Sequence, residues 1–306
     1  MNEALFSEQL YKSYKRLLFT LAYRMLGSVA DAEDVAHEAF ISLNAASPDE
    51  VHNVKAYLCK IATNRCLDRL RSARSRREAY VGPWLPEPIV EASSQEGDPY
   101  RSYEQTESLS IAYLLLLQQL SATERIVFLL REALQYEYEE IADIVSKSAT
   151  NCRQIFSRAK RAIGHHSPAE TASVLDFRPK EARTEGREDQ LADLVGKFIG
   201  ALSTGNLGQL MNVLSTDATL FSDGGGKVSA ATRPIAGAER IAKFFDGLMK
   251  KTSPGFSFRV ATVNGSTGIV TYEDGRASSV ISFHAKDGVI SAVYIVVNPD
   301  KLLLVQ

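Results

Sequence analysis

The residues with the clearest capacity for chemistry lie between Tyr138 and Ile163. An amphipathic segment, Tyr138–Val145, is followed by the turn Ser146–Ser148 and by a second amphipathic segment, Ala149–Ile163. This pattern predicts a helix-turn-helix, whose second helix would enter the major groove of DNA. Arg pairs with guanine there, Asn and Gln pair with adenine, and basic side chains neutralise phosphates.

The second segment is expected to turn a polar face outward and an apolar face inward. The outward set is Thr150, Asn151, Arg153, Gln154, Ser157, Arg158 and Arg161. The inward set is Ile155, Phe156, Ala159 and Ile163, which continue an apolar face begun by Ile141, Ala142 and Val145. An ordinary helical hairpin with a polar face would give the same local pattern, so the interpretation depends on its context in the chain.

Charge is distributed unevenly along the chain, although the net charge is only −2. Residues 31–40 carry four acidic residues and no Lys or Arg, whereas residues 55–78 carry eight basic and two acidic residues. Residues 81–145 hold twelve acidic residues against three Arg, and residues 146–166 hold five basic residues and no acidic one. Two basic segments separated by an acidic one suggest two contacts with a polyanion, and solvated helix faces are the alternative for either segment alone.

Length and composition exclude several classes of protein. The 306 residues suggest two or three domains, and 45% hydrophobic with 24% charged residues is ordinary for a globular protein. The longest apolar run, Ile111–Leu117, is far shorter than a membrane helix, and the first residues lack the pattern of a signal peptide. Three cysteines are too few for a disulfide framework. We therefore expect a cytoplasmic protein that makes no membrane contact.

Hydrophobic periodicity and helix-breaking residues divide the chain into predicted domains. Residues 1–80 and 109–168 are expected to be all-α, and residues 81–108, rich in Pro, Glu and Ser, predict a linker. Residues 187–298 predict an α+β domain, because helices come first and strands with turn signals follow. Residues 299–306 form a C-terminal tail.

The expected elements can be placed more closely. In the first domain we expect a helix that ends at Gly27, a second from Asp31 to about Leu43 with Asp31 as its cap, and a third from Val54 to about Arg77. In the α+β domain we expect helices at 189–202, 207–214 and 238–250. A mostly antiparallel, curved sheet is expected from strands at 219–222, 256–263, 267–272, 277–283 and 289–297.

The order of three segments resembles the extracytoplasmic-function (ECF) sigma factors of bacterial RNA polymerase. These segments are the acidic Asp31–Phe40, the basic Ile61–Arg71 and the later helix-turn-helix, and the resemblance covers about residues 3–80 and 109–166. It implies a transcription initiation factor that binds core RNA polymerase at the beta-prime clamp and the beta flap. It also implies recognition of the −10 and −35 elements of promoter DNA, without a cofactor or a metal.

This resemblance gives each segment candidate residues. Asp34 and Glu38, four residues apart on one helix face, and Asp31, one turn earlier, would meet cationic groups of the polymerase clamp. The outward set of the helix-turn-helix would read the −35 element. The −10 element would bind at the loop before the basic helix and along that helix, where a flipped base requires a pocket and cations. The −10 candidates are Asn53, Lys55, Tyr57, Asn64, Arg65 and Arg69.

Core packing is the alternative for one of these candidates and the expectation for two cysteines. Tyr57 stands where many members of the family have Trp, and it could equally be a core residue. Cys59 and Cys66 share a helix face seven residues apart, and we expect them to pack in the core rather than to bind zinc.

Three further motifs resemble the subgroup of these sigma factors, the SigJ type, that carries a fused SnoaL-like (NTF2-like) domain. They are Trp84–Pro88, Asp223–Lys227 and Asn298–Leu302. The glycines at 224–226 could form a phosphate-binding turn, but a tight hairpin that contacts another domain is favoured. We expect linker, turn and tail to pack near the sigma regions and to set the distance between the two DNA-reading domains. The expected regulatory contacts are Trp84, Pro86, Asp223, Gly225, Lys227, Asn298, Asp300 and Lys301.

The C-terminal domain is expected to regulate rather than to catalyse. SnoaL-like folds enclose a cone-shaped pocket, and some members are enzymes that use Asp and His as acid and base. Here the ionisable strand residues are few: Asp217, Asp223, Tyr272 and His284. The cone is therefore a candidate site for a small-molecule ligand. The alternative is a SnoaL-type enzyme or ligand sensor fused to an ordinary helix-turn-helix regulator, which would need neither the acidic face nor the basic helix.

Overall fold

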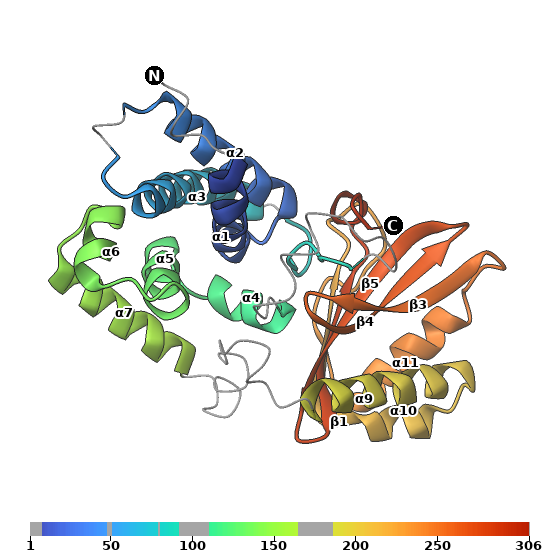
Figure 1. Ribbon diagram of the computed structural model, residues 1–306. Helices are drawn as coiled ribbons and strands as arrows, with labels where there is room; N and C mark the ends of the chain where they lie inside the picture. The colour runs from blue at the N-terminus through green and yellow to red at the C-terminus, as the bar shows by residue number, and fades with distance from the viewer. Residues whose placement is uncertain (1–7, 48–50, 79, 92–109, 165–185, 306) are drawn as a thin grey trace. The chain divides into compact units, whose positions relative to one another are not determined.

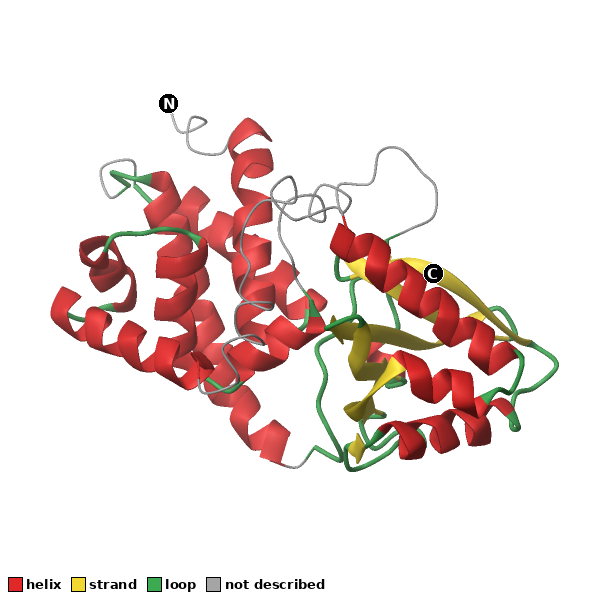
Figure 2. Cartoon of the chain, turned by 90° about the horizontal axis from the view of Figure 1, so that it is seen from below, coloured by secondary structure: helices red, strands yellow, loops and turns green. Residues whose placement is uncertain are grey.

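A computed structural model describes residues 8–47, 51–78, 80–91, 110–164 and 186–305 of the chain, without side chains for 73–78, 164 and 186–187 (Figures 1 and 2). The chain divides into two compact units. The first comprises residues 1–78 and 113–177, and the second comprises residues 79–112 and 178–306. The segment between the two helical domains therefore belongs largely to the second unit. Among the described residues, no helix combines the length and the apolar character of a membrane span.

The described part of the first unit is helical. Its elements are α1 (Glu8–Leu26), α2 (Val29–Ala45), α3 (Val54–Glu78), α4 (Ile111–Gln118), α5 (Ala122–Phe128), a π-helical turn (Leu129–Ala133), α6 (Tyr138–Val145) and α7 (Ala149–Gly164). Helices α1, α2 and α3 pack on one another around the fully buried Leu18, Met25, Phe40 and Leu58. The predicted helices of the first domain are thus confirmed to within a few residues at their ends.

The beginning of α2 differs from the prediction. Ser28, not Asp31, is the N-cap, because the Ser28 side chain accepts a hydrogen bond from the Asp31 backbone amide. Asp31 lies within the first turn of the helix, where its negative charge is still favourable. Its carboxylate is thereby free to contact another helix.

Helices α6 and α7 form the predicted helix-turn-helix. A capping box between Glu137 and Glu140 begins α6, and Ser146 ends it in the left-handed conformation with φ of 54°. The buried face consists of Ile141, Ile144, Cys152, Ile155, Ala159 and Ile163. The predicted core residues Ala142, Val145 and Phe156 are only half-buried. Ile144 lies in the core in place of its neighbour Val145.

The second unit contains the predicted α+β domain. Its elements are α9 (Gly186–Ser203), α10 (Leu207–Val213), β1 (Leu214–Asp223), β2 (Ile235–Ala236), α11 (Ala238–Met249), β3 (Phe256–Val263), β4 (Ser266–Glu273), β5 (Arg276–Lys286), β6 (Val289–Val296) and a 3-10 turn (Pro299–Lys301). The six strands form one sheet in the order β2-β1-β6-β5-β4-β3, in which only the β1–β6 pair is parallel. The mostly antiparallel sheet is therefore confirmed.

The helices of this unit lie together along the curved sheet (Figure 1). Phe198 of α9 makes edge contacts with Phe245 of α11 and Phe283 of β5, with ring centroids 5.0 and 5.1 Å apart. Ile241 and Val293, each 0% exposed, extend this core toward β6. The helical layer and the sheet thus enclose one hydrophobic core.

Two strands differ from the sequence-based prediction. Strand β1 begins at Leu214 rather than Thr219, because a register shift between these residues places the polar Ser215–Asp217 outside the alternating pattern. The two-residue strand β2 was not predicted, since it has no periodicity of its own. The linker also contributes one β-bridge, between Val90 and Val263 at the end of β3.

Candidate functional site

Helix α7 presents the whole outward set predicted for DNA. Thr150, Asn151, Arg153, Gln154, Ser157, Arg158 and Arg161 are all exposed. The opposite face is anchored by Cys152 and Ile155, which are 0% and 3% exposed. The helix begins where the Ser148 hydroxyl accepts a hydrogen bond from the Asn151 amide. The polar face is therefore held on a rigid helix.

Arg153 is held toward α6, unlike its neighbours. Its Nη2 donates to Glu139 Oε1 at 2.9 Å, and its guanidinium lies 5.1 Å from the centroid of the Tyr138 ring. The side chain remains 53% exposed. Arg153 would exchange an internal ion pair for a base contact, whereas Gln154 and Arg158 are exposed on the same helix.

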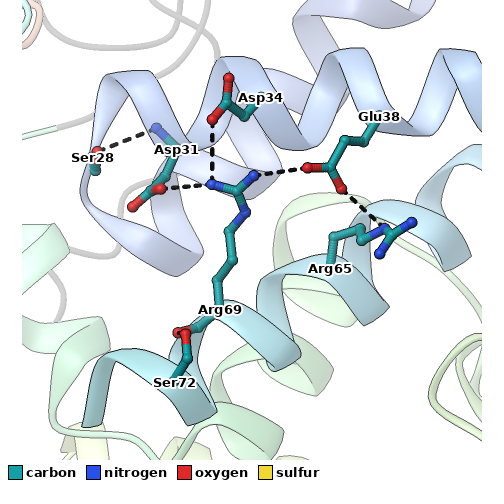
Figure 3. A network of polar contacts seen from close by, with 7 residues as sticks. All are labelled: Ser28, Asp31, Asp34, Glu38, Arg65, Arg69 and Ser72. Atoms are coloured by element: carbon teal, nitrogen blue, oxygen red, sulfur yellow. Dashed lines mark hydrogen bonds and ion pairs between the residues drawn. The ribbon is translucent and has the colours of Figure 1, made fainter. Parts of the chain in front are cut away.

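The acidic face of α2 contacts α3 through two arginines, Arg69 and Arg65 (Figure 3). Arg69 Nη1 donates to Asp31 Oδ1 at 2.6 Å and approaches Asp34 Oδ2 at 3.5 Å. Arg69 Nη2 donates to Glu38 Oε1 at 2.9 Å. Arg65 Nε lies 3.0 Å from the second oxygen of Glu38. We call these five residues the Arg69 cluster.

The Arg69 cluster joins residues that the sequence assigned to two separate sites. Burial alone would lower the pKa of Arg69, but the hydrogen bonds that Arg69 donates to Asp31 and Glu38 outweigh it and raise the pKa. Asp34 stays 67% exposed and Glu38 37% exposed. The carboxylates thus have an internal cationic partner and still face solvent, so both the polymerase and the DNA assignments remain predictions.

The other −10 candidates lie at the start of α3 or on its exposed side. The Asn53 side chain accepts a hydrogen bond from the Ala56 amide, so Asn53 caps the helix. Lys55 lies 5.1 Å from the centroid of the Tyr136 ring, in the segment before α6. Tyr57 is half-buried and Asn64 is exposed.

Cys59 and Cys66 pack in the core, as predicted. Both are 0% exposed, and burial raises the pKa of each thiol. The Tyr136 hydroxyl donates to Cys59 Sγ at 3.4 Å. These cysteines therefore serve the packing of α3.

The predicted regulatory residues meet around one buried carboxylate in the second unit. Asp223, at the end of β1, is 0% exposed. Its Oδ1 accepts hydrogen bonds from the Tyr80 hydroxyl at 2.6 Å and the Gly225 amide at 3.0 Å. Its Oδ2 accepts from the Leu85 amide at 2.8 Å and from Lys301 Nζ at 2.7 Å.

Trp84 and Asn298 complete this arrangement. The Lys301 ammonium lies 4.0 Å from the centroid of the Trp84 ring and also donates to the Leu85 carbonyl. Asn298 Nδ2 donates to the Tyr80 hydroxyl at 2.9 Å, and the Asn298 amide donates to the Asp223 carbonyl. We call the set formed by Tyr80, Trp84, Leu85, Asp223, Gly225, Asn298 and Lys301 the Asp223 network.

Gly225 is required by a close approach within this network. Its φ is +61°, and a Cβ there would lie 2.3 Å from Asn298 Nδ2. Pro86 is buried beside the network, and Lys227 makes an exposed ion pair with Asp300 at 2.5 Å. The structure thus joins linker, turn and tail to one another within the second unit. The predicted packing of this set near the sigma regions stays a prediction.

Sequence reasoning missed the contributions of Tyr80 and of the Leu85 amide. Burial, and next the hydrogen bond to Asp223, raise the pKa of the Tyr80 hydroxyl, so it donates at neutral pH. Backbone donors leave no sequence pattern. The sequence motifs included Asp223, but neither Tyr80 nor Leu85 was among the expected regulatory contacts.

The ionisable residues of the sheet do not gather into one site. Asp217 is exposed and bonded to Ser215, whose hydroxyl holds the pKa of that carboxyl low. The Tyr272 hydroxyl accepts from Arg259 Nε at 2.6 Å. Asp223 belongs to the Asp223 network, and His284 is half-buried on β5.

Comparisons with known proteins agree with this architecture. Residues 10–76 match the Sigma-70 region 2 family, and residues 110–163 match Sigma-70 region 4. The chain is 31% identical to the ECF RNA polymerase sigma factor SigJ of Mycobacterium tuberculosis, over 95% of this chain and 91% of that protein. It is 26% identical to the probable ECF sigma factor SigI of the same species, over 95% of this chain and 93% of that protein.

The structure has the same fold as a solved relative. The crystal structure of M. tuberculosis SigJ superposes with a TM-score of 0.75 and 27% identity, covering 96% of this chain and 98% of that one. Both sigma regions are matched, so the alternative of an ordinary helix-turn-helix regulator is not favoured. The chain belongs to the extracytoplasmic-function sigma factors, which bind core RNA polymerase and promoter DNA to initiate transcription.

Proposed function

We propose that this sigma factor docks on the polymerase beta-prime clamp through Asp31, Asp34 and Glu38 and on the beta flap through region 4. Helix α7 reads the −35 element, and the start of α3 with Asn64, Arg65 and Arg69 contacts the −10 element. The protein acts in the cytoplasm, where polymerase and chromosome are, and it is not an enzyme. The exposure of the entire outward set of α7 supports the −35 assignment.

The acidic face has two roles in this proposal. In the free protein, Arg69 and Arg65 neutralise the carboxylates and hold α2 on α3. On the polymerase, cations of the clamp compete for the same carboxylates, since charge complementarity directs encounter and orientation. Asp34 is the residue best placed for this contact, because it is the most exposed of the three and has the longest contact with Arg69.

The C-terminal domain regulates promoter use through the Asp223 network. The single observation that carries this proposal is a fully buried carboxylate with donors from two distant segments, Tyr80 with Leu85 and Lys301, and from the adjacent turn at Gly225. Tyr80 follows region 2 by only a few residues, so this network fixes one end of the chain that connects regions 2 and 4. A fixed connection restricts the separations of the two DNA-reading regions, and polymerase must stabilise the separation that matches the promoter.

Run-off transcription with core polymerase and full-length variants tests this regulation. Lys301→Met removes the ammonium that contacts Asp223, Leu85 and Trp84, and it leaves every DNA candidate in place. We expect a several-fold change in promoter activity, upward if the network restrains the factor. Lys243→Met is the matched control, because Lys243 makes an exposed ion pair with Glu239 on α11 of the same domain. Equal activity and equal promoter choice for Lys301→Met and Lys243→Met would contradict the proposal.

The cone of the C-terminal domain is the proposed place for a small-molecule effector. In the helices and sheet described, a cavity of about 310 Å³ lies between α9, α11 and strands β3 to β6. This volume is at the lower end of the range for ligand pockets.

A further inference from the structure

The lining of the cone cavity restricts the chemistry of its ligand. Its deep wall is apolar, formed by Phe245, Ile269, Ile281 and Ile295, which are 3–7% exposed. The charged residues that line it are Lys251 and Glu273, and both are exposed. A charge buried against the apolar wall would have no partner there, and such burial is costly. The cavity therefore selects against ions.

A cluster of hydroxyl groups gives the cavity one polar side. Thr271 Oγ1 lies 2.6 Å from Ser279 Oγ and 2.8 Å from Ser278 Oγ, and all three residues line the cavity. Three hydroxyls have three protons, and the two contacts use two of them. One O–H and several lone pairs are left for a ligand.

Ser253 adds a second polar position to the same cavity. Its Oγ is buried and has no hydrogen-bond partner among the residues that the structure describes. A buried hydroxyl without a partner is unfavourable, and a ligand oxygen in the cavity would satisfy it.

We propose that this cavity binds an uncharged, mainly apolar small molecule that carries a hydroxyl or carbonyl oxygen, held by the Thr271, Ser278 and Ser279 hydroxyls. This inference rests on the proposed regulatory function and names the effector class. Phe258 and Leu248, 45% and 44% exposed, mark the mouth of the cavity together with Lys251 and Thr252.

The cavity shares a wall with the C-terminal tail. Glu273, Ser278 and Val297 also line a second groove, of about 620 Å³, together with Leu302 and Val305 of the tail. The amide of Val297 donates to the Asp223 carbonyl. A ligand that moves Ser278 or Val297 therefore acts on the tail and on the Asp223 network.

Calorimetric titration of the full-length protein tests binding without transcription. The neutral probes are 1-adamantanol and 1-decanol, and the charged probe is adamantane-1-carboxylate. We expect saturable one-to-one binding of at least one neutral probe and at least tenfold weaker binding of the carboxylate. The proposal is overturned if neither neutral probe saturates the protein at its solubility limit. It is also overturned if the carboxylate binds as tightly as the neutral probes.

Variants test the role of the hydroxyl cluster. Thr271→Val and Ser278→Ala are each expected to weaken binding of the neutral probe about fivefold, which is the value of one neutral hydrogen bond. Ser282→Ala, on the same strand but outside the cavity lining, is the matched control and should bind as the wild type does. Ser278 is half-buried, so its variant remains informative if Thr271→Val fails to fold. Unchanged affinity in both hydroxyl variants would refute the assignment.

Tryptophan fluorescence separates this inference from the proposed regulation. Trp84 is the only tryptophan of the chain, and it stacks on Lys301 of the Asp223 network. The neutral probes do not absorb at the wavelengths at which tryptophan absorbs and emits. We expect their binding to change the emission of Trp84. Probe binding with unchanged emission would overturn the link to the network. The Lys301→Met transcription result depends on no ligand, so it judges the regulatory proposal alone.

Discussion

At the residue scale, Arg69 determines how the acidic face of α2 should be tested. It contacts Asp31, Asp34 and Glu38 while its own side chain is only 26% exposed. Replacing Glu38 would break its pairs with both Arg69 and Arg65, so a loss of polymerase binding could come from a loss of stability. Asp34 is the better probe, because its contact with Arg69 is long and its side chain is 67% exposed.

We therefore expect different outcomes for two charge reversals. Asp34→Lys should weaken binding to core polymerase at least tenfold and change the free energy of unfolding by less than about 0.5 kcal/mol. Glu38→Lys should lower the free energy of unfolding by about 1–2 kcal/mol, since it also places like charges together. Polymerase titration by fluorescence anisotropy and urea denaturation measure the two effects. Asp193→Lys, an exposed residue of α9, is the control, and wild-type affinity of Asp34→Lys would remove the acidic face from the interface.

The three cysteines give a second prediction at this scale. Cys59, Cys66 and Cys152 are free and buried, and burial raises the pKa of each thiol. Thiolate is the reactive form, so a native protein at pH 8 should show almost no reaction with a disulfide reagent within minutes. The protein unfolded in urea should react with three equivalents of the reagent per chain, one for each cysteine. A thiol that reacts rapidly in the native protein would show that its helix opens readily.

At the element scale, the proposal assigns base reading to some exposed residues of helix α7 and phosphate neutralisation to others. Gln154→Ala should cost about 1–3 kcal/mol on the preferred −35 sequence and little on others, if Gln154 pairs bidentately with a base. Arg158→Ala should weaken binding of all sequences equally. It should also reduce the slope of log binding constant against log salt concentration by about one. Anisotropy of holoenzyme on −35 variants over a salt series distinguishes the two. An identical sequence preference in both variants would contradict the assignment.

The elements also show what the sequence could and could not predict. The helices, the helix-turn-helix and its outward face follow from hydrophobic periodicity, which the structure confirms. The cap of α2 was misplaced because Ser28 and Asp31 are both good capping residues, and geometry decides between them. The bulge in β1 and the pairing of Arg69 with α2 depend on register between distant segments, which no local pattern records.

At the scale of the whole molecule, the Asp223 network ties the segment that follows region 2 to the C-terminal domain. Its carboxylate is buried, so each of its four donors offsets the cost of removing a charge from water. Truncating one donor leaves that cost uncompensated. The network should therefore respond as a unit, and a change on the Gly225 side should be detected at Trp84.

Gly225→Ala provides the sharpest test of this coupling. A Cβ at Gly225 would lie 2.3 Å from Asn298 Nδ2. Asn298 is 4% exposed and is held by hydrogen bonds to Tyr80 and from the Asp300 amide, so it cannot turn away without breaking them. We expect faster hydrogen exchange at residues 80–91, altered Trp84 emission and a changed promoter activity.

Gly205→Ala is the matched control for this change. Gly205 has a φ of +65°, close to the +61° of Gly225, but a Cβ there meets nothing within 4 Å. Both substitutions place Ala in the left-handed region, at a cost of about 1–2 kcal/mol, and only Gly225→Ala adds the contact with Asn298. The difference between the two variants therefore measures the Asp223 network and not backbone strain. If both variants showed the same exchange in 80–91 and the same transcription, the buried carboxylate would serve the stability of the domain and would have no part in promoter use.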